Sequence, residues 1–358
     1  MSEQTSFYAF VSNAADGDVA VFRVECGTGA IAPVARHPAG EAVMPMALSA
    51  DGKALYAATR GAQRSIVTYS LDHSTGRLTH AGTTPIEASL AYLSLTPSDT
   101  WLLGASYGEN SLSLYRAGRK IELRQVVEGF VHAHAVIASA DGRFAYVTSL
   151  GSDAVFCFSI TGHADDARLE FVQKVQVEAG FGPRHLRFSP DQRTLYVSSE
   201  FRATIAVFTR DVETGQLAAQ SVSPRAPALA HLQDGRVRSA QIDAATLASL
   251  VWGADFQIMP DGRYIYIAER TSSRLIAYRV TREGSLYYTG YTDTETQPRG
   301  FAIDPSGRYL VACGEKSAHV TVYAIDADSG ALAPVSRCEG GLGANWIEIA
   351  VQMPREAP

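Results

Sequence analysis

The sequence predicts an all-β protein, a seven-bladed β-propeller closed by pairing of the C-terminal strand with the N-terminal blade. Three observations lead to this fold: a recurring turn-and-strand unit, apolar strands that alternate with period two, and chain ends that carry complementary parts of one further unit. The repeat extends along the 358 residues without a linker or a shift in composition. We therefore expect a single domain over residues 1–358.

The recurring unit is a turn followed by an aromatic-aliphatic strand, and it occurs six times, as SADGKALYAAT, TPSDTWLLGAS, SADGRFAYVTS, SPDQRTLYVSS, MPDGRYIYIAE and DPSGRYLVACG. The turn residues Asp51, Asp99, Asp141, Asp191, Asp261 and Ser306 are separated by 48, 42, 50, 70 and 45 residues. Propeller repeats are typically about 40–50 residues long. Pro-Asp-Gly sequences suit tight turns between antiparallel strands. A strand rich in Val, Ile, Tyr and Phe lies on each side of the unit.

The two ends of the chain supply a seventh unit. SFYAFVSN and DVAVFRVE match the second and third strands of the repeat, and NWIEIAV near the C-terminus matches the first strand. Closure of this kind removes an exposed sheet edge. Outer fourth strands are expected in segments such as RLTHAGTTPI, LEFVQKVQV and LAPVSRCEG, and the long interval holds an insertion near residues 221–252 with a short helix or irregular loop.

Composition excludes several classes of protein. A net charge of -6 opposes nucleic-acid binding, and no run reaches the roughly 18 apolar residues of a membrane helix. The N-terminus lacks the pattern of a secretory signal, and the four cysteines are far apart without a CxxC pair, which indicates free thiols in a reducing compartment. GxGxxG after a strand, P-loop, GxSxG and HExxH motifs are absent. We expect a cytoplasmic monomer or weak homodimer without a cofactor and without a nucleic-acid or membrane partner.

Charged residues break the apolar pattern of the repeat at one rim. The first strand of each blade starts, and the second strand ends, at the same rim, so polar residues at these places converge in space. The first strands contribute His134, Arg184, His185, Asp255 and Arg299, and the ends of the second strands contribute Arg60, Glu200, Arg270 and Lys316. Burial of such groups is costly unless they are paired or hydrated, so the pattern favours a shared site. The alternative is that they are solvated strand ends or structural ion pairs between blades.

A metal site is the weaker interpretation of the histidines. His132 and His134 lie two residues apart on one face of a predicted strand, which is a spacing that can suit a metal ion. Because no acidic or cysteine cluster accompanies them in the sequence, we expect no metal.

Four stretches carry a family resemblance: HAHAVIASADGRFAYV, GPRHLRFSPDQRTLYVSSE, WGADFQIMPDGRYIYIAER and TETQPRGFAIDPSGRYLVACGEKSAHVTVY. They resemble the bacterial lactonase family of seven-bladed propellers, whose best-known activity is 6-phosphogluconolactonase, and the resemblance covers nearly the whole chain. It implies metal-independent hydrolysis of a sugar δ-lactone, above all 6-phosphoglucono-δ-lactone to 6-phosphogluconate in the pentose phosphate pathway. Ala135 replaces the serine expected from that pattern, and the insertion is divergent; both departures concern the substrate more than the fold.

A similar rim occurs in the fungal carboxymuconate-lactonizing enzyme, where the site has one His, one Glu and two Arg. By this resemblance His134, Glu200, Arg184 and Arg270 are the catalytic candidates. We interpret His134 as the acid/base and Glu200 as its partner, with the reverse assignment open; the two arginines would bind an oxyanion or the anionic group of the sugar. The expected substrate-binding residues are Arg299, Lys316 and Arg60 for a 6-phosphate, and His185 and Asp255 for sugar hydroxyls. A structural role for Arg299 between blades remains an alternative.

Two other functions stay open at this point. One is a related lactone enzyme, either a lactonizing cycloisomerase or a lactonase for an unphosphorylated aldonolactone. The other is a propeller that serves as an interaction scaffold. A scaffold needs no convergent set of His, Glu and Arg, and the sequence lacks WD40 signatures.

Overall fold

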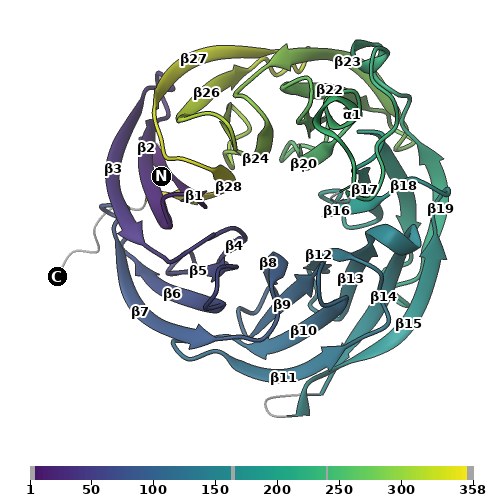
Figure 1. Ribbon diagram of the computed structural model, residues 1–358, viewed down its shortest axis with the longest axis horizontal. Helices are drawn as coiled ribbons and strands as arrows, with labels where there is room; N and C mark the ends of the chain where they lie inside the picture. Colours follow the sequence, from purple (N-terminus) through teal and green to yellow (C-terminus); the bar gives the residue numbers. More distant parts are fainter. Residues whose placement is uncertain (1–4, 163–165, 239–240, 353–358) are drawn as a thin grey trace.

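The computed structural model describes residues 5–162, 166–238 and 241–352. Seven four-stranded antiparallel sheets are arranged as blades around a central axis (Figure 1). The predicted seven-bladed propeller is confirmed.

Each blade has its first strand at the centre of the ring (Figure 1). The innermost strands are β4 (Met46–Leu48), β8 (Leu90–Leu95), β12 (Ala133–Ala138), β16 (Pro183–Phe188), β20 (Gly253–Ile258), β24 (Pro298–Ile303) and β28 (Ala344–Val351). The second strands are β1 (Ser6–Asn13), β5 (Ala54–Thr59), β9 (Trp101–Ser106), β13 (Phe144–Ser149), β17 (Thr194–Ser199), β21 (Tyr264–Glu269) and β25 (Tyr309–Gly314).

The third strand of each blade is mostly buried, and the outermost strand is the most exposed of the four. The third strands are β2 (Asp18–Glu25), β6 (Ser65–Leu71), β10 (Ser111–Arg116), β14 (Ala154–Thr161), β18 (Ile205–Arg210), β22 (Arg274–Val280) and β26 (His319–Ile325). The outermost strands are β3 (Ile31–Pro38), β7 (Leu78–Pro85), β11 (Glu122–Val127), β15 (Arg168–Gln176), β19 (Leu217–Val222), β23 (Leu286–Asp293) and β27 (Leu332–Glu339). The three segments predicted as fourth strands correspond to β7, β15 and β27.

The ring closes as predicted. β28 pairs antiparallel with β1, from Phe7 opposite Val351 to Asn13 opposite Ala344. Hydrophobic clusters bridge neighbouring blades; one of them packs Val11 and Phe22 of the first blade with Val311 of the last. Burial of apolar surface, at about 25 cal/mol per Å², therefore stabilises the junctions between blades as well as each sheet. The four cysteines are free, and Cys338 is the one that is not fully buried.

A bulge near the start of the inner strand recurs in six blades and positions the rim residues. In β16, two residues, Arg184 and His185, lie opposite one residue of β17. Further register shifts of this kind lie at Ala91, His134, Ala254–Asp255, Arg299–Gly300 and Asn345. A bulge interrupts the alternation of side chains and redirects the extra residue. Consecutive residues such as Arg184 and His185 can therefore face the same centre.

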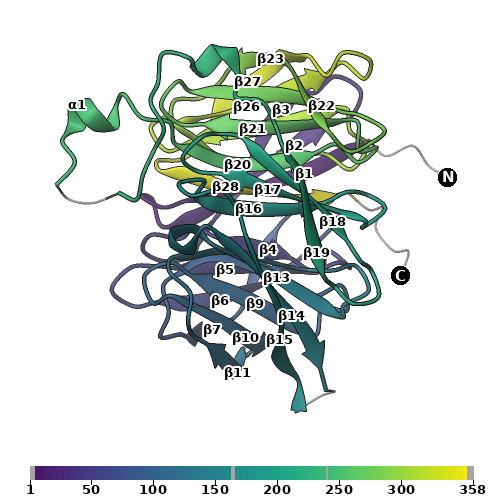
Figure 2. The ribbon, with the colours of Figure 1, turned by 90° about the vertical axis from the view of Figure 1, so that its right-hand side faces the viewer.

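The insertion begins after β19 and extends to β20. It contains a 3-10 turn, η3 (Pro227–Leu229), and one helical turn, α1 (Ala244–Leu247), while residues 239–240 of the predicted range lie outside the described part of the chain. Figure 2 shows α1 standing out from one face of the disc. Leu250 and Trp252 anchor the end of the insertion by packing with Leu150 and Phe201. A search of the described residues found no helix long and apolar enough to cross a membrane.

Candidate active site

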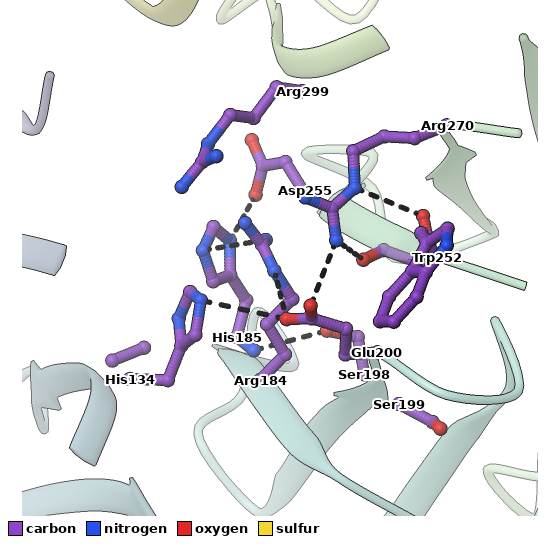
Figure 3. Close-up of polar contacts among 12 residues, drawn as sticks. His134, Arg184, His185, Ser198, Ser199, Glu200, Trp252, Asp255, Arg270 and Arg299 are labelled. Atoms are coloured by element: carbon purple, nitrogen blue, oxygen red, sulfur yellow. Dashed lines mark hydrogen bonds and ion pairs between the residues drawn. The ribbon is translucent and has the colours of Figure 1, made fainter. Parts of the chain in front are cut away.

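Three side chains from three blades, those of His134, Arg184 and Arg270, meet around the carboxylate of Glu200. Arg184 donates from Nε to Oε2 at 3.2 Å, and Arg270 donates from Nη2 to Oε1 at 3.0 Å. Nε2 of His134 lies 3.8 Å from Oε2 of Glu200 (Figure 3). The structure thus brings together the four residues that the sequence nominated for catalysis. All four are buried: the exposed fractions of His134, Arg184, Glu200 and Arg270 are 4%, 2%, 9% and 6%.

The charge of Glu200 is set by two opposing effects. Burial alone would raise the pKa of the carboxyl, but Arg270, Arg184 and Arg299 together hold the pKa below its ordinary value. Glu200 is therefore ionised at neutral pH. Because both oxygens already accept hydrogen bonds from guanidinium groups, the carboxylate is better suited to hold the two arginines than to remove a proton.

His134 is neutral at neutral pH. Burial, followed by the positive charges of Arg184, Arg299 and Arg270, lowers its pKa well below the ordinary value. The 3.8 Å separation from Glu200 is longer than a hydrogen bond, so Nε2 is not committed to the carboxylate. Nδ1 is buried and has no hydrogen-bond partner among the described residues. A neutral imidazole with an uncommitted nitrogen is available to accept a proton.

A chain of hydrogen bonds through His185 to Asp255 holds the guanidinium group of Arg184 in place. Nη1 of Arg184 lies 2.9 Å from Nε2 of His185, and Nδ1 of His185 lies 2.7 Å from Oδ1 of Asp255. A guanidinium can only donate, so Nε2 of His185 is the acceptor and its proton is on Nδ1, which donates to Asp255. Burial also lowers the pKa of His185, in keeping with a neutral ring. His185 and Asp255, predicted to contact sugar hydroxyls, thus hydrogen-bond to each other, and His185 also accepts a hydrogen bond from Arg184.

The three residues predicted to bind a phosphate are placed differently from one another. Arg299 points toward His134 and His185 (Figure 3) and donates from Nη1 to Oε1 of Glu315 at 2.9 Å. Arg60 donates to Oγ of Ser89 at 2.9 Å and to Sδ of Met44 at 3.1 Å. Lys316 is exposed and lines a different space from the other two.

Two cavities are lined by residues that belong to the cluster or support it. The first, here called the channel cavity, has a volume of about 340 Å³ and is lined by inner-strand residues that include Tyr92, Arg187, Asp255 and Glu348. The second, here called the rim cavity, has a volume of about 360 Å³ and is lined by Arg238, Trp252, Arg270, Thr271 and Lys316 among others. Asp255, which supports Arg184 through His185, lines the channel cavity, and Arg270, which binds Glu200, lines the rim cavity.

Sequence reasoning missed Arg187 and Arg238. Arg187 donates to the hydroxyl of Tyr92 at 2.7 Å and lies 3.4 Å from Asp255, so it supports the chain of hydrogen bonds that holds Arg184. Its position three residues after Arg184 on the same strand was a usable signal. Arg238 lies in the insertion, which has no counterpart in the repeat, so no aligned position could have indicated it.

A metal site finds no support in the arrangement of the side chains. Among the described residues, no group of three His, Cys, Asp or Glu side chains could hold a metal ion. His132, the other histidine of the pair, stacks on Tyr107 with ring centroids 4.2 Å apart. The chemistry that the cluster offers is proton transfer at His134 beside donors that can stabilise a developing negative charge.

The comparisons with a family model and with curated relatives agree on one family. The family described as "Lactonase, 7-bladed beta-propeller" matches residues 7–347. The chain is 33% identical over 312 residues to the 6-phosphogluconolactonase of Cronobacter sakazakii, an alignment that covers 86% of this chain and 87% of that protein. It is 34% identical over 313 residues to the 6-phosphogluconolactonase of Photorhabdus laumondii, with coverage of 86% and 88%.

Solved structures share the fold. The periplasmic gluconolactonase of Pseudomonas aeruginosa superimposes with a TM-score of 0.83 at 20% identity, covering 97% of this chain and 100% of that one. A protein from Lactobacillus plantarum gives a TM-score of 0.81 at 20% identity, with coverage of 96% and 99%. At this level of identity, both similarities establish the fold alone.

Proposed function

The chain belongs to the lactonase family of seven-bladed β-propellers, and from this premise we propose that it hydrolyses 6-phosphoglucono-δ-lactone to 6-phosphogluconate without a metal ion. The observation that carries the proposal is the buried set of His134, Arg184, Glu200 and Arg270 at one rim of the ring. Hydrolysis of a lactone needs a base for water, donors for the oxyanion and a proton for the leaving ring oxygen. The cluster has a candidate for each.

His134 is the proposed base. Its neutral imidazole takes a proton at Nε2 from a water molecule as the oxygen of that water attacks the lactone carbonyl carbon. The electron pair of the carbonyl π bond moves onto the carbonyl oxygen. A positioned general base typically contributes about 10²–10⁴-fold to the rate.

Arg184 and Arg270 are the proposed oxyanion donors. Burial lowers the pKa of Arg184 to about 9, so its guanidinium stays charged at neutral pH. Glu200 holds both guanidinium groups in place, which means that the donors need not reorganise when the negative charge develops.

Collapse of the tetrahedral intermediate completes the reaction. The carbon–oxygen double bond re-forms, the bond to the ring oxygen breaks, and the imidazolium of His134 returns its proton to that oxygen. The carboxylic acid that results ionises, so each turnover releases one proton to solvent. His134 therefore acts first as base and then as acid, and Glu200 remains ionised throughout.

The choice of a phosphorylated sugar rests on relatives and on charge. The curated relatives are named 6-phosphogluconolactonase. Cations crowd this rim, since Arg60, Arg299 and Lys316 are present in addition to the two arginines of the cluster. Guanidinium groups match the geometry of phosphate oxygens. A place in the pentose phosphate pathway and in the cytoplasm belongs to the same proposal, and cell fractionation would test the location because one structural neighbour is named periplasmic.

A lactonase for unphosphorylated aldonolactones is the second candidate, favoured by the neighbour named gluconolactonase. The test measures proton release from 6-phosphoglucono-δ-lactone and from glucono-δ-lactone, with spontaneous hydrolysis subtracted and with EDTA in a parallel series. The proposal predicts a clear preference for the phosphorylated lactone and full activity in EDTA. Equal kcat/KM for the two lactones would remove the phosphate assignment, and loss of activity in EDTA would remove the metal-free mechanism.

A further inference from the structure

The rim cavity is a candidate anion site that the mechanism above does not use. Resting on the proposed function, we propose that this cavity binds the phosphate group of the substrate, with Arg238 of the insertion and Lys316 as its ligands. Arg238, Arg270 and Lys316 line the cavity, and no Asp or Glu is among the described residues that do so. A cavity with three cations and no carboxylate favours a ligand that carries more than one negative charge.

The insertion holds the side chain of Arg238 in place. Its guanidinium carbon lies 4.4 Å from the centroid of the Trp252 ring. Trp252 is itself fixed, because it is buried and its Nε1 donates to the carbonyl oxygen of Leu247 at 3.1 Å. Stacking on an aromatic face reduces the freedom of an arginine and leaves the hydrogen-bonding edge of its guanidinium available.

The charge of Arg238 is available to a ligand. No carboxylate among the described residues lies within ion-pair distance of it, and the same holds for Lys316. Arg238 also interacts electrostatically with the cluster: burial and then Arg270 lower its pKa, and Glu200 partly offsets that lowering. The hydroxyls of Thr271, Ser273 and Thr296 add neutral donors around the cavity.

The other two predicted phosphate ligands, Arg299 and Arg60, already interact with other side chains. Glu315 neutralises Arg299 through an ion pair at 2.9 Å, and Glu315 also accepts from Nε2 of Gln297 at 2.6 Å. Arg60 already donates to Ser89 and Met44. Glu315 therefore neutralises Arg299, whereas Arg238 and Lys316 bring charge without an ion-pair partner into the rim cavity.

The cavity is in the right place for a substrate that spans two sites. Arg270 lines it and also binds Glu200, so the cavity begins where the catalytic cluster ends. In a 6-phosphorylated δ-lactone the phosphate is carried on C6, which is attached to C5, so it lies beside the leaving ring oxygen and a few bonds from the carbonyl carbon. With the lactone carbonyl at Arg184 and Arg270, the phosphate falls within reach of the cavity that Arg270 shares with Arg238 and Lys316.

The test compares kcat/KM for 6-phosphoglucono-δ-lactone and glucono-δ-lactone in the wild type, Arg238→Ala and Lys316→Ala. We expect each substitution to lower the value for the phosphorylated lactone by about 10–100-fold, the effect of one charge-assisted hydrogen bond. The value for the unphosphorylated lactone should stay within about twofold. Arg236→Ala is the matched control, because Arg236 is an exposed cation of the same insertion that does not line the cavity.

The outcomes separate this inference from the proposed function. If the wild type prefers the phosphorylated lactone but the two variants keep that preference, the phosphate binds elsewhere and the inference is wrong. Equal losses on both lactones would show that the substitutions damage the site in general, which also overturns it. A wild type without any preference would overturn the choice of substrate itself, before a variant is measured. Melting temperatures of the variants confirm that each remains folded.

Discussion

Glu200→Gln tests the assignment of Glu200 as the residue that holds both arginines. Glutamine has nearly the same shape but only one acceptor oxygen, and its amide group would face a second guanidinium with donor against donor. Glu200 now accepts from Arg184 at 3.2 Å and from Arg270 at 3.0 Å, both fully buried. The substitution leaves two buried cations without their counter-charge.

The magnitude follows from these two contacts. A hydrogen bond to a charged group contributes about 1.5–3 kcal/mol, and breaking a buried ion pair costs about 3–5 kcal/mol. We expect Glu200→Gln to lose about 3 kcal/mol of stability and a few degrees of melting temperature. Since both oxyanion donors lose their fixed geometry, kcat should fall by about 10²–10³-fold.

The assay combines thermal unfolding with proton release from 6-phosphoglucono-δ-lactone. Asp304→Asn is the matched control: Asp304 is also buried, and its carboxylate accepts from the backbone nitrogens of Ser306, Arg308 and Tyr309 in the turn after β24. It should lose comparable stability yet keep kcat within about twofold. The reasoning is refuted if Glu200→Gln keeps its activity, or if both variants lose activity in proportion to stability.

Three further predictions concern other parts of the structure. Because burial and neighbouring cations lower the pKa of His134, kcat/KM should be flat near neutrality. It should fall only well below pH of about 6.5, where protonation removes the base. A pH–rate profile with an acid limb at or above that pH would contradict this. Asp255→Asn should lower kcat about tenfold, because Arg184 is then less well fixed, with KM nearly unchanged; steady-state kinetics that show an effect on KM alone would contradict it. Gly300→Ala should cost about 1–3 kcal/mol in thermal unfolding, since its Cβ would lie 2.6 Å from the carbonyl oxygen of Asn345, and an unchanged melting temperature would contradict it.

The fold was predictable because the repeat is regular. Turn residues such as Asp141 and Asp191 recur at the spacing of a blade, and the third strands alternate cleanly. Closure by the C-terminal strand followed from counting: the N-terminal unit lacks its first strand, and NWIEIAV supplies one. These features depend on local pattern, which a sequence displays directly.

The convergence of the site was predictable for the same reason. Residues at the start of the first strand and the end of the second strand meet at one rim in every blade, so His134, Arg184, Glu200 and Arg270 could be placed together before their contacts were known. The hydrogen bonds between these side chains were harder to predict from the sequence. Strict alternation would point Arg184 and His185 to opposite faces, and the bulge in β16 allows them to bond to each other.

The partners of the outer cations depended on details that no repeat encodes. Arg299 and Lys316 were predicted to act together, but Glu315 turns toward Arg299 while Lys316 lies in the rim cavity. The chain has left the regular strand after Gly314, so the direction of these two side chains no longer follows from alternation. Arg238 was unpredictable because the insertion has no equivalent in the other blades.

The most direct measurement of the central claim is the kcat of His134→Gln on 6-phosphoglucono-δ-lactone, corrected for spontaneous opening of the ring. His134 makes no hydrogen bond to Glu200, so its replacement should leave the melting temperature nearly unchanged. The account predicts that kcat falls by about 10²–10⁴-fold, the contribution of a general base. A folded His134→Gln protein that turns over at the wild-type rate would contradict the assignment of the catalytic cluster.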